Sequence, residues 1–175
     1  KVASPGNTTY FIHPGKGDDA LAGTAPDKAW KSIAKLNAMR LAPGDKVMIA
    51  PGLHEETLMP SGKGTAERPI EIVFTPGIHE FAPDKAMRLP KFVSNSCDAP
   101  QVPSPIGIIV EDVSHLRLTG TAGKTTILMG GRMVEFFNDH SEDITYSGLT
   151  FDLKRPTVSE FRVVETAENS AVIRI

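Results

Sequence analysis

The feature that most constrains this chain is a series of short apolar segments, each closed by Gly, Pro, Asn or Asp. After residue 45 these segments are "KVMIAPG", "IEIVFTPG", "IGIIVED", "HLRLTG", "TTILMGG", "MVEFFND", "DITYSG" and "LTFDL". Apolar or alternating runs of about four to six residues between turn residues are typical of β-strands. The region contains no second helical period, which argues against alternating strand–helix units. The pattern therefore predicts an all-β domain.

Two pairs of segments align with each other. "VSHLRLTG" (113–120) matches "SEDITYSG" (141–148), and "TTILMG" (125–130) matches "LTFDLK" (149–154). Repeats of about 20–30 residues built from short strands suggest a solenoid whose coils stack on one another. A β-sandwich is the alternative, because it also uses many short strands. The pattern favours a parallel β-helix over the sandwich.

The stretch "APDKAWKSIAKLNAMRLAPGD" (25–45) has a different pattern. Its apolar residues Trp30, Ile33, Leu36 and Met39 recur at helical spacing, which predicts an amphipathic helix. Asp27 is the expected helix cap, and "APGD" is the expected stop because proline disfavours helix in the residue before it. Such a helix would cover the raw strand edges at the start of a β-helix.

Composition excludes several classes of partner and cofactor. Lys and Arg number 19 and Asp and Glu 21, so a net charge of −2 gives no reason to expect nucleic acid or an anionic membrane as partner. No apolar run reaches the ~18 residues of a membrane span. A single cysteine, Cys97, excludes an intrachain disulfide and is expected to be a small buried hydrophobe. The five histidines lack zinc-site spacing and no nucleotide motif is present, so we expect no metal and no cofactor.

The opening "YFIHPGKGDDALAGTAPDKAWKSIAKLNAMRLAPGDKVMIAPGLHEE" (10–56) resembles the start of many secreted bacterial right-handed β-helix proteins. Polysaccharide lyases, glycosidases and non-catalytic surface proteins share this pattern. The resemblance implies a right-handed parallel β-helix with one amphipathic N-terminal capping helix. It also implies a bacterial protein that is secreted, periplasmic or at the cell surface. His54 occupies a position that is often Tyr in this pattern and is expected to stack in the first coil.

Residues 76–165 are similar to the N-terminal part of glycoside hydrolase family 110, through "TPGIHEF", "GGRM" and "FDLKRP" in that order. The resemblance implies an exo-acting, metal-independent, inverting α-galactosidase that cleaves terminal α-1,3-linked galactose. Chains of this family are several times longer, and their catalytic carboxylates lie on later coils. We therefore expect a fragment whose catalytic residues lie beyond Ile175.

The same resemblance gives expected boundaries. Residues 1–45 form the N-terminal strand and capping helix, residues 46–158 the first β-helix coils, and residues 159–175 the start of an inserted β-barrel or the next coil. "EFRVVETAENSAVIRI" is expected to form the first hairpin of that barrel, and Pro156 to end the preceding strand because it has no N–H for the ladder. Further domains of the same chain are expected as partners, and a homodimer is left open.

An inverting glycosidase needs an acid and a base on opposite faces of the sugar, about 6.5–9.5 Å apart. Of the acids Asp112, Glu135, Asp139 and Asp143, the three aspartates fit turn roles, whereas Glu135 could face outward or into a cleft. Asp18 and Asp19 fit a solvated loop better than a calcium site.

Asp152 is the strongest candidate among the acids. Side chains two apart on a strand share a face, so Lys154 is expected beside it, and a nearby cation lowers a carboxyl pKa. That context suits a sugar-hydroxyl acceptor or an ion pair, not a general acid. Arg155 borders the same segment, and Arg132 follows two glycines that would leave its guanidinium exposed. We predict Asp152, Arg155 and Arg132 as contacts to a glycan substrate.

Two alternatives to the galactosidase remain open. A polysaccharide lyase would need a basic residue beside a charge-neutralising site, often calcium, and the absence of an acidic cluster weighs against it. A β-helix that binds carbohydrate without catalysis is the other, and it would lack a pair of facing carboxylates.

Overall fold

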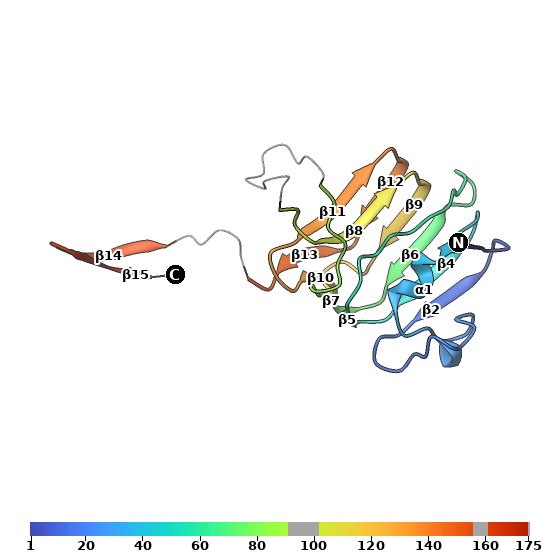
Figure 1. Ribbon diagram of the computed structural model, residues 1–175, viewed down its shortest axis with the longest axis horizontal. Coiled ribbons are helices and arrows are strands. Elements are labelled where there is room, and N and C mark those ends of the chain that lie inside the picture. Colours follow the sequence, from blue (N-terminus) through green and yellow to red (C-terminus); the bar gives the residue numbers. More distant parts are fainter. Residues whose placement is uncertain (91–101, 156–160, 175) are drawn as a thin grey trace.

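Most strands belong to three parallel sheets, and successive strands of the chain join different sheets (Figure 1). The computed structural model describes residues 1–90, 102–155 and 161–174. The predictions for Cys97 and Pro156 lie outside the described residues.

The five-stranded sheet has the order β12-β9-β6-β4-β2. Its strands, in chain order, are β2 (Thr9–Ile12), β4 (Lys46–Ile49), β6 (Ile70–Phe74), β9 (Ser114–Thr119) and β12 (Glu142–Ser147). The four-stranded sheet has the order β13-β10-β7-β5. Its strands are β5 (Gly52–His54), β7 (Gly77–Phe81), β10 (Thr125–Met129) and β13 (Thr150–Leu153).

The remaining parallel pairs are β8 (Ile106–Glu111) with β11 (Val134–Asp139), and β1 (Val2–Ala3) with β3 (Met39–Arg40). From β6 to β13 the chain visits the five-stranded sheet, the four-stranded sheet and the β8–β11 pair in that order, and then begins again. The path of the chain is therefore repetitive, as the aligned segments indicated.

Each strand predicted after residue 45 is present, so the all-β class and the parallel pairing are confirmed. A β-sandwich would be built from antiparallel sheets, whereas the ladders of these three sheets are parallel. The two aligned pairs of segments are paired strands in the same register. Leu116 of β9 pairs with Ile144 of β12, and Ile127 of β10 pairs with Phe151 of β13, as the sequence alignment places them.

The core lies between the sheets, where equivalent side chains of successive strands stack. Val47, Ile72, Leu118 and Tyr146 occupy equivalent positions on β4, β6, β9 and β12. The first three are fully buried, and burying each such side chain contributes about 1.5–3 kcal/mol. Tyr146, on the last strand of the sheet, is only partly buried. This stacking of inward-facing side chains therefore explains why apolar and polar residues alternate along each strand.

The predicted helix over 25–45 is largely wrong. The structure has a 3₁₀ turn, η1 (Pro26–Lys28), an extended segment through Trp30, and a short helix, α1 (Ile33–Asn37), before β3 begins. Trp30 pairs with β2 instead, since its N–H donates to Phe11 and its carbonyl accepts from His13. Asp27 lies within η1, and the residue in the cap position is Ala25. Trp30, Ile33 and Leu36 are buried as their spacing indicated, but tertiary pairing determines the backbone.

The last two strands form an antiparallel hairpin, β14 (Arg162–Ala167) and β15 (Ser170–Arg174), around the "TAENS" turn. The hairpin stands apart from the other strands, and the side chains of both strands are exposed (Figure 1). No helix in residues 1–90, 102–155 and 161–174 is long and apolar enough to cross a membrane.

Candidate functional site

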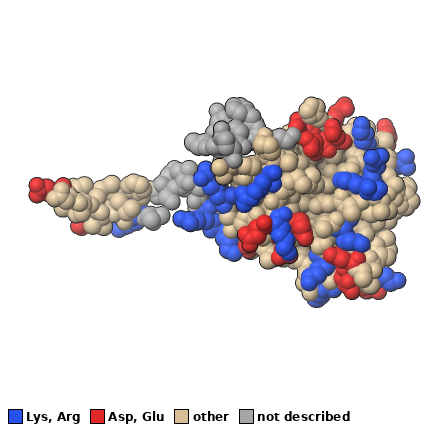
Figure 2. Space-filling view, in the orientation of Figure 1, with Lys and Arg blue, Asp and Glu red and all other residues tan. Residues whose placement is uncertain are grey.

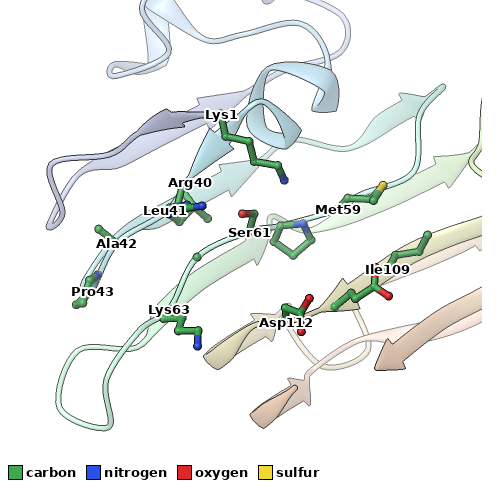
Figure 3. Close-up of a pocket in the computed structure, with 13 residues that line it drawn as sticks. Lys1, Arg40, Leu41, Ala42, Pro43, Met59, Ser61, Lys63, Ile109 and Asp112 are labelled. Atoms are coloured by element: carbon green, nitrogen blue, oxygen red, sulfur yellow. The ribbon is translucent and has the colours of Figure 1, made fainter. Parts of the chain in front are cut away.

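A cavity of about 640 Å³ opens between β3 with the turn that follows it, the segment 59–63, and the end of β8 (Figure 3). Main-chain pairing places these segments side by side. The N–H of Leu41 donates to Ser61, and the N–H of Ile109 donates to Leu58. Gly62 has a φ of +132°, and a side chain there would collide with the carbonyl oxygen of Leu41. A glycine at this position therefore allows the close approach that forms one wall.

One buried carboxylate shapes the turn beside the cavity. Asp45 is fully buried, and its two carboxylate oxygens accept hydrogen bonds from the N–H groups of Ala42 (2.7 Å) and Thr8 (3.0 Å). Ala42 and Pro43 line the cavity. Asp45 therefore acts as a positioning residue, because it fixes this wall without lining it.

The residues that line the cavity include both positively and negatively charged side chains. Lys1 and Arg40 come from the N-terminal segment and β3, Lys63 from the middle segment, and Glu111 and Asp112 from the end of β8 (Figure 3). Burial and the neighbouring Arg40 lower the pKa of the Lys1 side-chain ammonium. Donors and acceptors of both signs, interleaved with apolar side chains, suit a ligand with many hydroxyl groups.

The cavity has the features of a binding site and not those of a complete catalytic centre. Its two carboxylates, Glu111 and Asp112, are consecutive residues on one wall. Inverting glycosidases instead place an acid and a base on opposite faces of the sugar. The groups of three or more potential metal ligands that a metal site needs are absent from the part of the chain that the structure describes.

The residues predicted from the sequence lie elsewhere. Asp152 is exposed on β13, where its Oδ1 accepts the N–H of Leu153. Its expected partner, Lys154, instead forms an ion pair with Glu80 of β7 at 2.8 Å. None of these residues lines the cavity beside β8.

Arg132 and Arg155 follow the same ends of two paired strands. The paired residues Met129 and Leu153 end β10 and β13, and each arginine follows shortly after. Both are exposed. Lys and Arg side chains gather on the side of the body that faces the β14–β15 hairpin (Figure 2). The roles of Asp152, Arg155 and Arg132 in substrate binding remain predictions.

Several acids considered from the sequence have local partners. Asp143 accepts from His115 at 2.7 Å, and Asp139 lies 2.8 Å from His140. Asp143 has a positive φ, but it is the second residue of β12, so its predicted place in a turn is wrong. Asp19 binds the N–H groups of Lys31 and Ser32 and the Ser32 hydroxyl. Asp19 therefore organises the loop around Lys31, whereas Asp139 and Asp143 lie on β11 and β12.

Sequence reasoning missed Arg40, Lys63 and Glu111. The segment 55–64 has no periodic pattern, and the cavity is assembled from segments far apart in the chain. The nearest signal is the "APGD" turn, whose pattern predicts only the end of a helix. The acidic "VED" end of β8 is a second such signal.

Comparison with known proteins identifies relatives of this chain. A protein of Akkermansia muciniphila named alpha-1,3-galactosidase A is 38% identical over 165 residues, which is 94% of this chain and 28% of that protein. One of Bacteroides thetaiotaomicron with the same name is 27% identical over 111 residues, covering 62% of this chain and 19% of that protein. The resemblance to alpha-1,3-galactosidases is therefore confirmed, and this chain spans less than a third of the length of these relatives.

No family model matches the chain. Among solved structures, a GH136 lacto-N-biosidase from Eubacterium ramulus aligns with a TM-score of 0.49 at 16% identity, over 85% of this chain and 35% of that one.

Proposed function

We propose that this chain, a homologue of the glycoside hydrolases named alpha-1,3-galactosidase, is the N-terminal part of an exo-glycosidase that removes terminal α-1,3-linked galactose from glycans with inversion. The observation that carries the proposal is the 38% identity that extends over 94% of the chain. The catalytic carboxylates are proposed to lie outside residues 1–175, because the carboxylates of the cavity beside β8 share one wall. The proposed location is outside the cytoplasm of a bacterium.

The finer fold is part of the same proposal. We infer that the three sheets wind as a right-handed parallel β-helix, which the repeated visiting order of the strands supports. Residues 1–45 would form the N-terminal cap and 46–158 the first coils. Residues 159–175 would begin an inserted barrel, which the exposed β14–β15 hairpin supports. A further coil would stack on β12 and β13, where Tyr146, Phe151 and Leu153 are only partly buried.

Within this chain the cavity beside β8 is the proposed glycan-binding region. Arg40, Lys63 and Asp112 would contact hydroxyl groups there. Asp152, Arg155 and Arg132 stay proposed as contacts at the border of the substrate cleft that later coils would complete.

A carbohydrate-binding protein without catalysis is the second candidate, favoured by the absence of facing carboxylates in this cavity. A polysaccharide lyase on the same fold is the third. The lyase would form an unsaturated uronate product, whereas the binding protein would form none.

The test incubates the full-length protein with galactose-α-1,3-galactose, with its α-1,4 and α-1,6 isomers, and with uronate polymers. We expect free galactose from the α-1,3 disaccharide and none from the other isomers, while the 175-residue chain alone releases none. A rise in ultraviolet absorbance on uronate polymers would establish the lyase instead. Binding of the α-1,3 disaccharide without any product would favour the non-catalytic alternative.

A further inference from the structure

The cationic side chains that line the cavity beside β8 have no acidic partner among the described residues. Lys1, Arg40 and Lys63 all line it, and none of them forms an ion pair with a carboxylate in residues 1–90, 102–155 and 161–174. Elsewhere on the surface, Lys85 pairs with Glu55 at 2.7 Å. The positive charges in this cavity are therefore available to a ligand.

A second cavity, of about 740 Å³, follows β5 and differs in this respect. Asp19, which lines it, accepts hydrogen bonds from the N–H groups of Lys31 and Ser32. His54 lines it too, and the predicted stacking of this residue is confirmed, since its buried ring lies on that of His79 with centroids 5.6 Å apart. These polar groups already hold the fold together, so the cavity beside β8 offers more to a ligand.

Strand pairing brings Lys1 and Arg40 to the same face. β1 and β3 are parallel, and Ala3 lies opposite Arg40 in their register. Residues that are opposite on paired strands project to the same side, and so do residues two apart on one strand. Lys1 therefore projects to the same side as Arg40, and its ammonium group points into the cavity (Figure 3).

The two cations destabilise each other at this face. Burial, and then the charge of Arg40, lower the pKa of the Lys1 ammonium. Loss of water around a cation and repulsion from a second cation both disfavour its charged form. An anion that binds here would oppose both effects, because it attracts the two cations and its oxygens replace the lost water as hydrogen-bond acceptors.

The opposite side of the cavity has a different character. Asp112, in the turn that follows β8, lies across the cavity from Lys1 (Figure 3). Met59 and Ile109 add apolar surface to the lining, and apolar surroundings strengthen the attraction between opposite charges. The lining therefore fits a ligand with an anionic group at one end, near Lys1 and Arg40, and a hydroxyl group at the other, near Asp112.

We propose that the cavity beside β8 binds a glycan that carries an anionic substituent, a sulfate ester or a carboxylate, with Lys1 and Arg40 binding the anionic oxygens and Asp112 accepting a hydrogen bond from a hydroxyl group. That the ligand is a glycan rests on the proposed function, whereas the negative charge of its substituent follows from the lining. A guanidinium suits both kinds of substituent, because two of its N–H groups bind two oxygens at once. Its other N–H groups stay available to a neighbouring hydroxyl.

The test is isothermal titration calorimetry of the full-length protein at low salt with three probes. These are the methyl β-galactoside 6-sulfate, the methyl β-galacturonoside and the uncharged methyl β-galactoside, none of which has an α-1,3 linkage to cleave. We expect at least one charged probe to bind about tenfold more tightly than the uncharged one, because hydrogen bonds between charged groups are the stronger ones. The tighter of the two charged probes identifies the substituent as sulfate or carboxylate.

Arg40→Gln should lower this preference for the charged probe about tenfold, since it removes the positive charge and keeps a polar side chain. Arg40 is exposed, so the replacement is compatible with folding. The matched control is Arg117→Gln, which removes an exposed arginine of β9 outside the cavity and should leave the preference unchanged.

Two results would overturn the proposal. One is equal affinity of the wild-type protein for the charged and uncharged probes, and the other is a preference that Arg40→Gln leaves intact. Either result, combined with galactose release from the α-1,3 disaccharide, would reject the anionic substituent and leave the proposed function standing. A preference that depends on Arg40 without any galactose release would support the anion site and reject the hydrolysis.

Discussion

Acidification from pH 7 to pH 5 is expected to lower the free energy of unfolding by about 2 kcal/mol through His54 alone, by proton linkage. The folded state holds His54 neutral, with its pKa lowered to about 3 by burial and by the charge of His79. The unfolded chain protonates the same side chain near the ordinary value of 6.5. This contribution is therefore fully present above about pH 6.5 and is lost as the pH falls toward 3. His79, whose pKa is also lowered, adds to the loss in the same direction.

Urea unfolding at pH 7, 6 and 5 measures the effect through the fluorescence of Trp30, which is buried and is the single tryptophan. His54→Phe keeps a ring in the stack and removes one titrating group, so its stability should depend less on pH. His140→Gln is the control, since His140 is an exposed histidine. If the free energy of unfolding depends equally on pH in the wild-type chain and in His54→Phe, the effect cannot be attributed to His54.

Asp45→Ala is expected to lower the free energy of unfolding by about 3–5 kcal/mol, because it leaves two N–H groups, of Thr8 and Ala42, without an acceptor. The carboxylate is fully buried, so water does not replace it easily. Asp45→Asn keeps one acceptor oxygen but turns an N–H₂ group toward the other donor. Its effect should fall between those of wild type and alanine.

The loss is measured by urea unfolding at pH 7, together with Asp84→Ala as the control. Asp84 is exposed, and removing it should change stability by no more than about 0.5 kcal/mol. An Asp45→Ala variant as stable as Asp84→Ala would show that the buried carboxylate does not hold the turn. In that case the account of the wall formed by Ala42 and Pro43 would also be wrong.

The strands after residue 45 could be predicted because their signal is local. One face of each strand, as in Ile70, Ile72 and Phe74, is buried in the stack, and turn residues end each run. The alignment of 113–120 with 141–148, and of 125–130 with 149–154, identified partners because paired strands occupy equivalent positions in the path of the chain. The buried face of each strand and its pairing partner can therefore be recognised from the sequence alone.

The backbone of residues 25–45 and the cavity beside β8 depend on contacts between residues that lie far apart in the chain. Trp30 looked helical by spacing, but its backbone pairs with β2, and Asp19 takes the next two N–H groups. Asp152 stood out within its own segment, yet the cation beside it binds Glu80, which lies on a strand much earlier in the chain. The cavity beside β8 joins Arg40, Lys63 and Glu111, which no local pattern connects.

The central claim is that the full-length protein cleaves terminal α-1,3-linked galactose with inversion. The most direct measurement is a time course of ¹H NMR spectra during hydrolysis by that protein of the methyl glycoside of galactose-α-1,3-galactose, whose second sugar is released as a methyl galactoside that cannot change its anomeric form. We predict that β-galactose is the first product and that the α-anomer appears only later, at the rate of mutarotation. Absence of galactose release, or α-galactose as the first product, would contradict the claim.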